Sequence, residues 1–287
     1  MIKMSDRDNK KTIDKVLSFL ESNKGRYVSG ADMAESIGIS RNAVWKAINE
    51  LRSRGYDIES ITNKGYMLSE DNDIISAEGI RSFIGPEYGC MAEHLFVYDS
   101  VDSTNNKAKE AALKGVCHGT CIIAARQDSG RGRRDHQFYS PEGGIYMSVV
   151  LLPDKIPFSK NDAVTAFIGV AVCKAIESLT GLKPVIMGIN DLYLDGKKIC
   201  GILIESGSEF DSGILQWIVA GIGINFDSDI KKFPRELKGN VTSLYPPGRG
   251  DMSKNRLIAK ILENIDVLAK NSEKDIKREF TKRRVEK

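Results

Sequence analysis

The sequence holds little that would place the protein in a membrane or in an oxidising compartment. No apolar run in its 287 residues approaches the roughly 20 residues of a membrane span, and its polar start lacks the apolar segment of a signal peptide. Its five cysteines form no CxxC pair, which argues against a zinc site and favours reduced thiols. We therefore expect a cytoplasmic protein without membrane attachment and without a metal site of its own.

Internal repeats and low-complexity tracts are also absent from the sequence. The charged and apolar fractions, 28% and 41%, are ordinary for a globular protein, and the length suggests about two domains. Residues 1–68 contain 12 Lys and Arg against 9 Asp and Glu, a balance of +3 that equals the net charge of the whole chain. The N-terminal segment is therefore where a nucleic-acid partner would bind.

This N-terminal segment has the helix pattern of a DNA-binding module. Apolar residues at helical spacing predict a helix over residues 12–22. Ser29 and Gly38 predict the start and the end of a short second helix, and Ser40 caps a third helix over residues 41–54. A short helix, a glycine-containing turn and a longer helix together indicate a helix-turn-helix.

The polar face of the third helix carries side chains of the kind that contact phosphates and base edges in DNA. After this helix, two short strands flank a turn at residues 62–65 with a lysine at its tip, the pattern of a wing. We expect a winged helix-turn-helix domain over residues 1–68 that binds DNA through Ser40, Arg41, Asn42, Trp45, Lys46, Asn49 and Lys64. A general three-helix interaction module would show the same periodicity, and Trp45 would serve equally for packing into the wing.

The rest of the chain predicts a domain of a different class. Residues 69–76 are polar and acidic and are interpreted as a linker, after which a second domain covers residues 77–287. Strands are predicted at residues 95–98, 120–125, 144–152, near Val185 and at 216–225, and a hairpin over residues 193–205 that turns at Asp195-Gly196. Helices are predicted over residues 104–114, 162–179 and 254–268. Helices clustered with mostly consecutive strands predict an α+β fold with a mixed sheet.

A glycine-spaced basic loop over residues 127–134 lies between two of the predicted strands. Glycines let the backbone turn its amides toward an anion, and the three arginines of the loop can neutralise phosphate oxygens by charge-assisted hydrogen bonds. The loop is therefore typical of a phosphate-binding segment. An isolated Gly-Arg-Gly-Arg is more often a solvated basic turn, so this interpretation depends on the motifs around it.

Four further motifs accompany the loop. They are Ser103-Thr104-Asn105, Ser140-Pro141-Glu142-Gly143-Gly144, Asn190-Asp191 and Gly196-Lys197-Lys198-Ile199-Cys200-Gly201-Ile202-Leu203. In this order and spacing, the set resembles the bifunctional biotin protein ligase/biotin operon repressor family, and the resemblance covers nearly the whole chain. Lipoate-type ligases share the central fold, but the winged helix argues against that family.

The resemblance implies both a fold and a reaction. The fold is a winged helix-turn-helix followed by a mixed-sheet domain of the biotin/lipoate ligase type. The enzyme would use ATP, with Mg²⁺, to convert biotin to biotinyl-5′-AMP with release of pyrophosphate, and would then transfer biotin to a lysine of a biotin carboxyl carrier protein. The same chain would act as a biotin-responsive repressor that binds operator DNA as a homodimer when it is liganded.

The resemblance also assigns the ligand-binding and catalytic positions. Biotin and its adenylate would contact Ser103, Thr104, Asn105, Gln127, Arg131, Gly132, Arg133, Lys198, Gly201 and Ile202. Lys198, Arg133 and Asp191 would be the catalytic residues. Each residue alone is a weak signal, because Ser-Thr-Asn before a helix is usually a cap and a single turn carboxylate usually has no such role.

Four departures from the family pattern bear on catalysis. Met187-Gly188-Ile189 stand where the family has Lys-Trp-Pro, so a cation near the phosphates is missing, and Asp135 adds an anion to the loop. Phe138 replaces a tryptophan, and we expect the chain to lack the small SH3-like domain that follows in the family. Losing one preorganised charge contact costs about 2–4 kcal/mol in a transition state. Two hypotheses follow: a biotin ligase that is also a repressor, and a biotin-sensing regulator that has lost ligase turnover.

Overall fold

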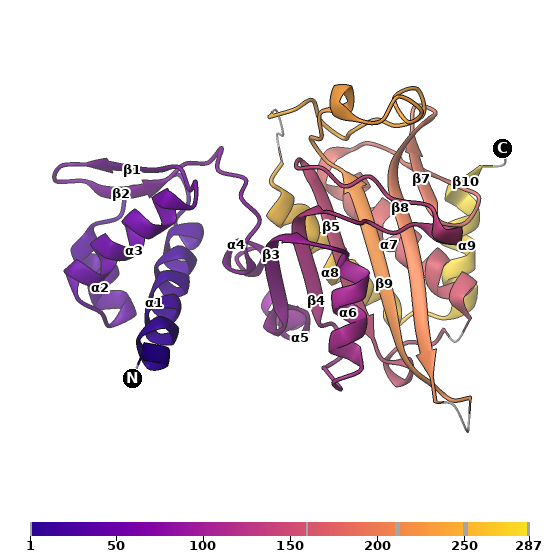
Figure 1. The fold of residues 1–287 in the computed structure, drawn as a ribbon, viewed down its shortest axis with the longest axis horizontal. Helices are drawn as coiled ribbons and strands as arrows, with labels where there is room; N and C mark the ends of the chain where they lie inside the picture. The colour runs from indigo at the N-terminus through magenta and orange to yellow at the C-terminus, as the bar shows by residue number, and fades with distance from the viewer. Residues whose placement is uncertain (1, 159, 210–212, 249–251, 286–287) are drawn as a thin grey trace. The chain divides into compact units, whose positions relative to one another are not determined.

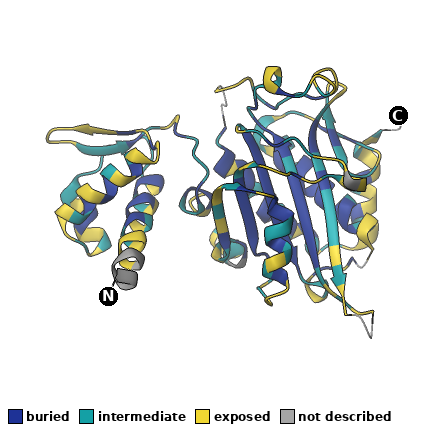
Figure 2. Cartoon of the chain, viewed as in Figure 1, coloured by how far each residue is buried: buried dark blue, intermediate teal, exposed yellow. Residues whose placement is uncertain are grey.

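The computed structural model describes residues 2–158, 160–209, 213–248 and 252–285, with the side chains in these ranges except those of residues 2–7, 90 and 135. The chain divides into two compact units, Met1–Phe83 and Ile84–Lys287 (Figure 1). In both units, the buried residues lie on the helix and strand faces that point inward (Figure 2).

The first unit is a winged helix-turn-helix, which confirms the predicted fold. Its elements are α1 (Ile2–Ser22), α2 (Gly30–Ile37), α3 (Arg41–Ser53), β1 (Ile58–Ile61) and β2 (Gly65–Leu68). The two strands pair antiparallel and form the wing. The apolar faces of the helices and the base of the wing share one core, which includes Val16, Met33, Val44, Ile48, Leu51 and Leu68.

Serine caps begin both helices of the helix-turn-helix. Ser29 Oγ accepts hydrogen bonds from two backbone amides of α2 at 3.1 and 3.4 Å, and Ser40 Oγ accepts one from α3 at 3.1 Å. Gly38 ends α2 with a left-handed φ of 74°. These predicted caps are confirmed. The first helix begins at Ile2, well before the predicted residue 12, because the intervening residues include no glycine or proline that would end it.

The segment predicted as a linker is packed on the winged helix. Asn72 is 6% exposed, its Oδ1 accepts a hydrogen bond from a backbone amide at 3.1 Å, and its carbonyl accepts one from Lys24 Nζ at 2.5 Å. Ser76 is also buried and caps α4 (Ala77–Arg81), which packs on α1. Because α4 belongs to the first unit, the boundary between the units follows Phe83 and lies later than predicted.

The second unit is built on one sheet of eight strands. They are β3 (Leu95–Val101), β4 (Cys121–Gln127), β5 (Gly144–Leu151), β6 (Val185–Met187), β7 (Asp191–Leu194), β8 (Lys197–Ser208), β9 (Leu215–Asn225) and β10 (Arg284–Val285). They lie in the order β10-β6-β7-β8-β9-β5-β4-β3. The pairs β3/β4 and β10/β6 are parallel and the other neighbours are antiparallel, which confirms the predicted mixed sheet.

Helices cover both faces of this sheet (Figure 1). α6 (Thr104–Ala112) packs on β4, β5 and β9, while α7 (Asn161–Thr180) covers the other face and packs against α8 (Lys254–Ala269) and α9 (Glu273–Arg283). Shorter elements are α5 (Gly89–Glu93) and 3₁₀ turns at Pro86–Tyr88, Arg133–Asp135, Pro153–Lys155 and Ile230–Lys232. The charged segment after α8 is also helical, as α9.

α7 departs from the expectation that no segment reaches the length of a membrane span. By length and composition it is apolar enough to cross a membrane, with a mean hydropathy of 1.6 in its most apolar window. However, 61% of that window is buried inside the unit. Because α7 packs against the sheet, α8 and α9 (Figure 2), its composition is that of a core helix.

The cysteines whose side chains are described are free thiols. Cys121, Cys173 and Cys200 are buried and Cys117 is exposed, while the side chain of Cys90 lies outside the described residues. Burial raises the pKa of the three buried thiols, that of Cys173 to about 12. Among the described residues, no group of three or more His, Cys, Asp or Glu side chains could hold a metal ion.

Candidate functional site

The basic loop after β4 folds back on itself. Two of its first amides, those of Asp128 and Ser129, donate to carbonyls at the end of β3, both at 2.9 Å. The Phe138 amide donates to the Gly130 carbonyl at 2.9 Å, and a methyl group at Gly130 would overlap the Phe138 carbonyl. Glycine is therefore required at this position by the close approach of two backbone segments.

The loop lines a cavity of about 900 Å³ together with the start of α6 and parts of β7, β8 and β9. All the residues that the resemblance assigns to ligand binding or catalysis line this cavity: Ser103, Thr104, Asn105, Gln127, Arg131, Gly132, Arg133, Asp191, Lys198, Gly201 and Ile202. The volume is within the range of small-molecule sites. The predicted roles of these residues stay predictions, but the fold brings all of them to one place.

Buried side chains at the start of α6 form a hydrogen-bonded network with the sheet. Gln127 Oε1 accepts from the amide of Thr104 at 2.8 Å and lies 3.1 Å from the Thr104 hydroxyl. Ser148 Oγ on β5 lies 2.8 Å from Thr104 Oγ1 and 2.6 Å from Asn105 Oδ1. Because each hydroxyl has one proton, donation from Thr104 to Ser148 and from Ser148 to Asn105 satisfies all three groups. The network therefore orients these side chains in the absence of a ligand.

Glycines on β8 and β9 leave parts of the cavity floor without side chains. Gly201 and Gly223 are cross-strand partners, and the Phe138 ring lies against both. A methyl group at Gly201 would lie 2.9 Å from a ring carbon, and one at Gly221 would overlap the Asn105 side chain. At these glycines the floor is backbone, with Phe138 and Asn105 directly above it.

The predicted catalytic residues form a chain of polar contacts across the cavity. Lys198 Nζ forms an ion pair with Asp191 Oδ1 at 2.8 Å. Asn190 Nδ2 donates to the same oxygen at 2.8 Å, and Arg133 Nη1 donates to Asn190 Oδ1 at 3.1 Å. The basic loop is thus linked to the β6–β7 turn, and one cation of the site is already neutralised.

Glu205 is a second carboxylate beside the site, and the sequence analysis did not include it. Its Oε1 pairs with Arg131 Nη1 at 3.1 Å and Lys109 Nζ at 2.8 Å, and its Oε2 accepts from Asn105 Nδ2 at 2.8 Å. Burial alone would raise the pKa of Glu205, but the hydrogen bonds from Lys109 and Asn105 and the charge of Arg131 bring it below its ordinary value. Glu205 is therefore ionised at neutral pH.

Glu205 and Ser148 were both absent from the sequence analysis, although the sequence carries a signal for the strand face of each, if not for its partners. Glu205 follows Gly201 by four residues in one strand, so the period of two places both on the same face. Ser148 is a polar residue within an otherwise apolar, fully buried strand. Buried polar groups of this kind need hydrogen-bond partners, which points to a neighbouring polar site.

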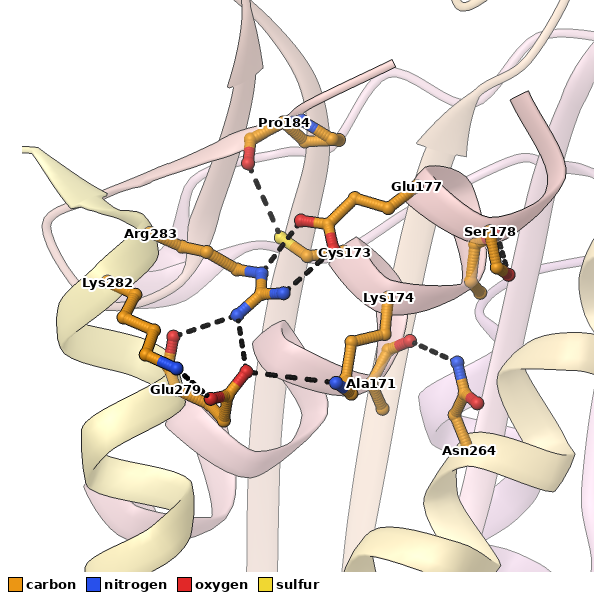
Figure 3. Close-up of polar contacts among 11 residues, drawn as sticks. Ala171, Cys173, Lys174, Glu177, Ser178, Pro184, Asn264, Glu279, Lys282 and Arg283 are labelled. Atoms are coloured by element: carbon orange, nitrogen blue, oxygen red, sulfur yellow. Dashed lines mark hydrogen bonds and ion pairs between the residues drawn. The ribbon is translucent and has the colours of Figure 1, made fainter. Parts of the chain in front are cut away.

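The C-terminal strand closes the cavity next to β6, and Arg284 and Val285 line it. An ion-pair network holds this strand in place through α9 (Figure 3). Arg283 donates to both carboxylate oxygens of Glu177 on α7 at 2.8 and 2.7 Å, and to Glu279 Oε2 at 2.9 Å. Hydrogen bonds from Lys282 and Arg283 lower the pKa of Glu279 to about 2, so this network persists across the physiological pH range.

Three residues that depart from the family pattern, Met187, Gly188 and Phe138, line the same cavity. Met187 and Gly188 line the wall where the resemblance leads one to expect a cation and an aromatic ring. The Asp135 side chain lies outside the described residues, and its neighbour Arg134 has a left-handed φ of 54°. At Met187 the cavity wall thus has an uncharged thioether at the position where the resemblance predicts a lysine.

The residues predicted to bind DNA lie on α3 and the wing. Arg41, Trp45 and Lys64 line a groove of about 560 Å³ between the helix-turn-helix and the wing. Of the others, Asn42 and Lys46 are exposed, Asn49 is half-buried and Ser40 caps α3. Trp45 is 54% exposed, so its ring is not part of the core of the unit.

Comparisons with known proteins agree with both units. Residues 97–225 match the Biotin/lipoate A/B protein ligase family, and residues 12–67 match the HTH domain. The bifunctional ligase/repressor BirA of Bacillus spizizenii is 38% identical over 253 residues, which cover 88% of this chain and 76% of that protein. BirA of Escherichia coli is 32% identical over 202 residues, 70% of this chain and 60% of that protein.

Similarity extends to solved structures. A biotin protein ligase from Aquifex aeolicus in complex with biotin and ATP matches with a TM-score of 0.57 at 29% sequence identity, covering 67% of this chain and 79% of that chain. Its apo structure matches with a TM-score of 0.54 at 26% identity over the same share of this chain. Given the helix-turn-helix, the mixed sheet and the extent of identity, the chain belongs to the family of bifunctional biotin protein ligases and biotin operon repressors.

Proposed function

We propose that the chain is an ATP-dependent biotin protein ligase that also represses transcription in response to biotin. The observation that carries this proposal is the convergence of all the predicted ligand and catalytic residues on one cavity, in a chain that also contains a winged helix-turn-helix. It is supported by the 38% identical relative, which is named a bifunctional ligase/repressor, and by the similar structure that contains biotin and ATP.

Biotin would place its ureido ring against the hydrogen-bonded network at the start of α6. This ring is neutral and has both donors and acceptors, so it needs amides and hydroxyls within a largely apolar cavity. Such groups are supplied by Ser103, Thr104, Asn105 and Gln127, and apolar or backbone contacts by Gly201 and Ile202.

The reaction has two steps that both build negative charge on oxygen. The carboxylate of biotin attacks the α-phosphate of ATP and pyrophosphate leaves; a lysine of a biotin carboxyl carrier protein then attacks the acyl carbon and AMP leaves. The protein would act mainly by positioning and electrostatic stabilisation. Arg131 and Arg133 would contact the phosphate, and Lys198 would act as a point charge beside it, held by Asp191 at 2.8 Å.

Mg²⁺ would enter this site with ATP. It usually takes most of its ligands from phosphates and waters and only one or two from carboxylates. Asp191 is the carboxylate among the described lining residues of the cavity and would be its protein ligand. Because the described residues include no larger group of metal-binding side chains, they fit a metal that the nucleotide carries. Bound there, the ion would neutralise charge on the departing pyrophosphate.

Repression would use the groove between the helix-turn-helix and the wing as the operator-binding surface. We expect a cytoplasmic protein that forms a homodimer when liganded, since a dimer places two recognition helices on two half-sites. The dimer fraction measured by sedimentation should rise when biotin and ATP are added. An equal monomer fraction with and without these ligands would count against this part of the proposal.

The experiment that tests the enzyme is biotin-dependent exchange of labelled pyrophosphate into ATP, with lipoate as the control substrate. Exchange with biotin, above the level with lipoate, supports a ligase. A biotin-sensing regulator without turnover is the second candidate, favoured by Met187 and Gly188 on the cavity wall. Calorimetric binding of biotin without any exchange would establish that second candidate instead.

A further inference from the structure

Glu205 connects two parts of the candidate site that the sequence places far apart. One of its oxygens accepts a hydrogen bond from the Asn105 amide at 2.8 Å, on α6. The other pairs with Arg131 of the basic loop at 3.1 Å and with Lys109 of α6 at 2.8 Å. A single carboxylate on β8 therefore touches both the predicted biotin pocket and the predicted phosphate loop.

The contact with Asn105 decides which way its amide points. A carboxylate accepts hydrogen bonds but cannot donate them when ionised, so only the Nδ2 end of Asn105 can face Glu205. The Oδ1 end then faces Ser148, 2.6 Å away. Because Asn105 is 5% exposed, the opposite orientation would leave its largely buried Oδ1 facing the Glu205 carboxylate, which has no proton to donate.

The contact with Arg131 has a different character because it is more exposed. The Arg131 side chain is 41% exposed and that of Glu205 is 21% exposed. Lys109 pairs with the same carboxylate oxygen and has a 25% exposed side chain. If Arg131 turned toward a phosphate, Lys109 would still neutralise Glu205, so the release of Arg131 leaves no half-buried charge without a partner.

We propose that Glu205 is a positioning residue of the ligase site. One carboxylate oxygen of Glu205 holds the Asn105 amide in one orientation. The other oxygen binds Arg131 and so keeps the basic loop against α6 until a phosphate binds the guanidinium instead. The second part rests on the proposed function, since a phosphorylated ligand must displace Glu205 from Arg131.

The loop carries its own probe, because trypsin cleaves after arginine and the loop has Arg131, Arg133 and Arg134. Without ligand, Glu205→Gln removes the charge that holds Arg131 while keeping an acceptor for Asn105. We expect trypsin to cleave the loop of the full-length Glu205→Gln variant about fivefold faster than the loop of the unchanged chain. Mass spectrometry of the new ends identifies the cleavage sites. With biotin and ATP added, the difference should disappear because the phosphate then holds the loop.

Two further variants separate this role from a general loss of structure. Glu110→Gln is the matched control, because Glu110 is an exposed carboxylate on α6 that pairs with Lys107 at 3.2 Å, away from the cavity. Glu205→Asp keeps the charge and should restore most of the protection. Equal cleavage rates in Glu205→Gln and the unchanged chain, or equal rates in Glu205→Gln and Glu110→Gln, would overturn the proposal.

A kinetic measurement tests the hold on Asn105. A glutamine at position 205 can donate as well as accept, so the Asn105 amide is no longer restricted to one orientation. In pyrophosphate exchange, Glu205→Gln should raise the KM for biotin severalfold and leave the KM for ATP unchanged or lower. An equal rise in the KM for biotin and the KM for ATP would contradict the role of Glu205 in orienting Asn105. If the unchanged chain shows no exchange, the proposed enzyme fails, while the cleavage comparison without ligand still decides the role of Glu205.

Discussion

Replacing Ser148 with alanine tests the buried network beneath the candidate biotin pocket. Ser148 is fully buried, and its hydroxyl is the donor 2.6 Å from Asn105 Oδ1. Thr104 keeps Gln127 as a partner when this hydroxyl is lost, but Asn105 Oδ1 is left without that donor. A buried acceptor without a partner costs about 1–3 kcal/mol, so the free energy of unfolding of the second unit should fall by that amount.

The assay follows the second unit alone. The chain has two tryptophans, Trp45 in the first unit and Trp217 in the second. In a Trp45→Phe background, the fluorescence of Trp217 during urea unfolding reports the second unit, which avoids treating two units as one transition. The matched control is Ser206→Ala, because Ser206 is exposed and its hydroxyl lies 3.4 Å from Asn161.

The control should change the free energy of unfolding by no more than about 0.5 kcal/mol, as is usual for exposed positions. If Ser148→Ala and Ser206→Ala gave the same value within error, the Ser148 hydroxyl would not be satisfying Asn105, and the orientation argued for that amide would be refuted. An unchanged slope of free energy against urea would show that the compactness of the two end states is the same in both variants.

Three other predictions concern charged residues. Lys46→Ala, at an exposed position of α3, should weaken binding to all DNA and lower the slope of log affinity against log salt by about one; an unchanged slope would remove Lys46 from the phosphate contacts. Lys198→Met should slow pyrophosphate exchange by roughly 10² to 10³ with little change in melting temperature, and a variant that keeps more than about a tenth of the rate would contradict the role of Lys198. Glu21 is 6% exposed, and burial, which outweighs the attraction of Lys24, raises its pKa. Because the native state then ionises less readily than the unfolded chain, the stability of the first unit falls as pH rises through and above the ordinary range of glutamate. Glu21→Gln should therefore raise the melting temperature more at about pH 8 than at about pH 5, relative to the exposed control Glu35→Gln. Equal changes in melting temperature at the two pH values would count against a raised pKa of Glu21.

Local chemistry accounts for the features that the sequence predicted well. Ser29, Ser40 and Gly38 act within their own helices, so neighbouring residues were enough to place these helix ends. The turn at Asp195 and Gly196 has φ values of 50° and 75°, as expected of a tight hairpin built from such residues. The motifs of the cavity were found because each retains a recognisable order of residues.

Contacts between distant segments account for what the sequence did not reveal. Glu205 forms a hydrogen bond with Asn105, which lies 100 positions away in the sequence. The sequence of the strand that contains Glu205 does not indicate this partner. Asn72 and Ser76 have the composition of a linker, yet both are buried because α4 docks on α1. β10 has only two residues and directly follows α9, which Arg283 attaches to α7, so its place beside β6 depends on contacts far from it in the sequence.

The glycines beneath the cavity limit how far the sheet can be strengthened by substitution. Glycine within a strand destabilises it by about 0.5–1 kcal/mol relative to alanine. At Gly201, Gly221 and Gly223, however, an added methyl group would press against Phe138 or Asn105, and overpacking of this kind costs about 1–3 kcal/mol. The usual route to a more stable strand is therefore closed at the three positions that keep the site open, and a library screened for thermal stability alone would be expected to retain glycine at all three.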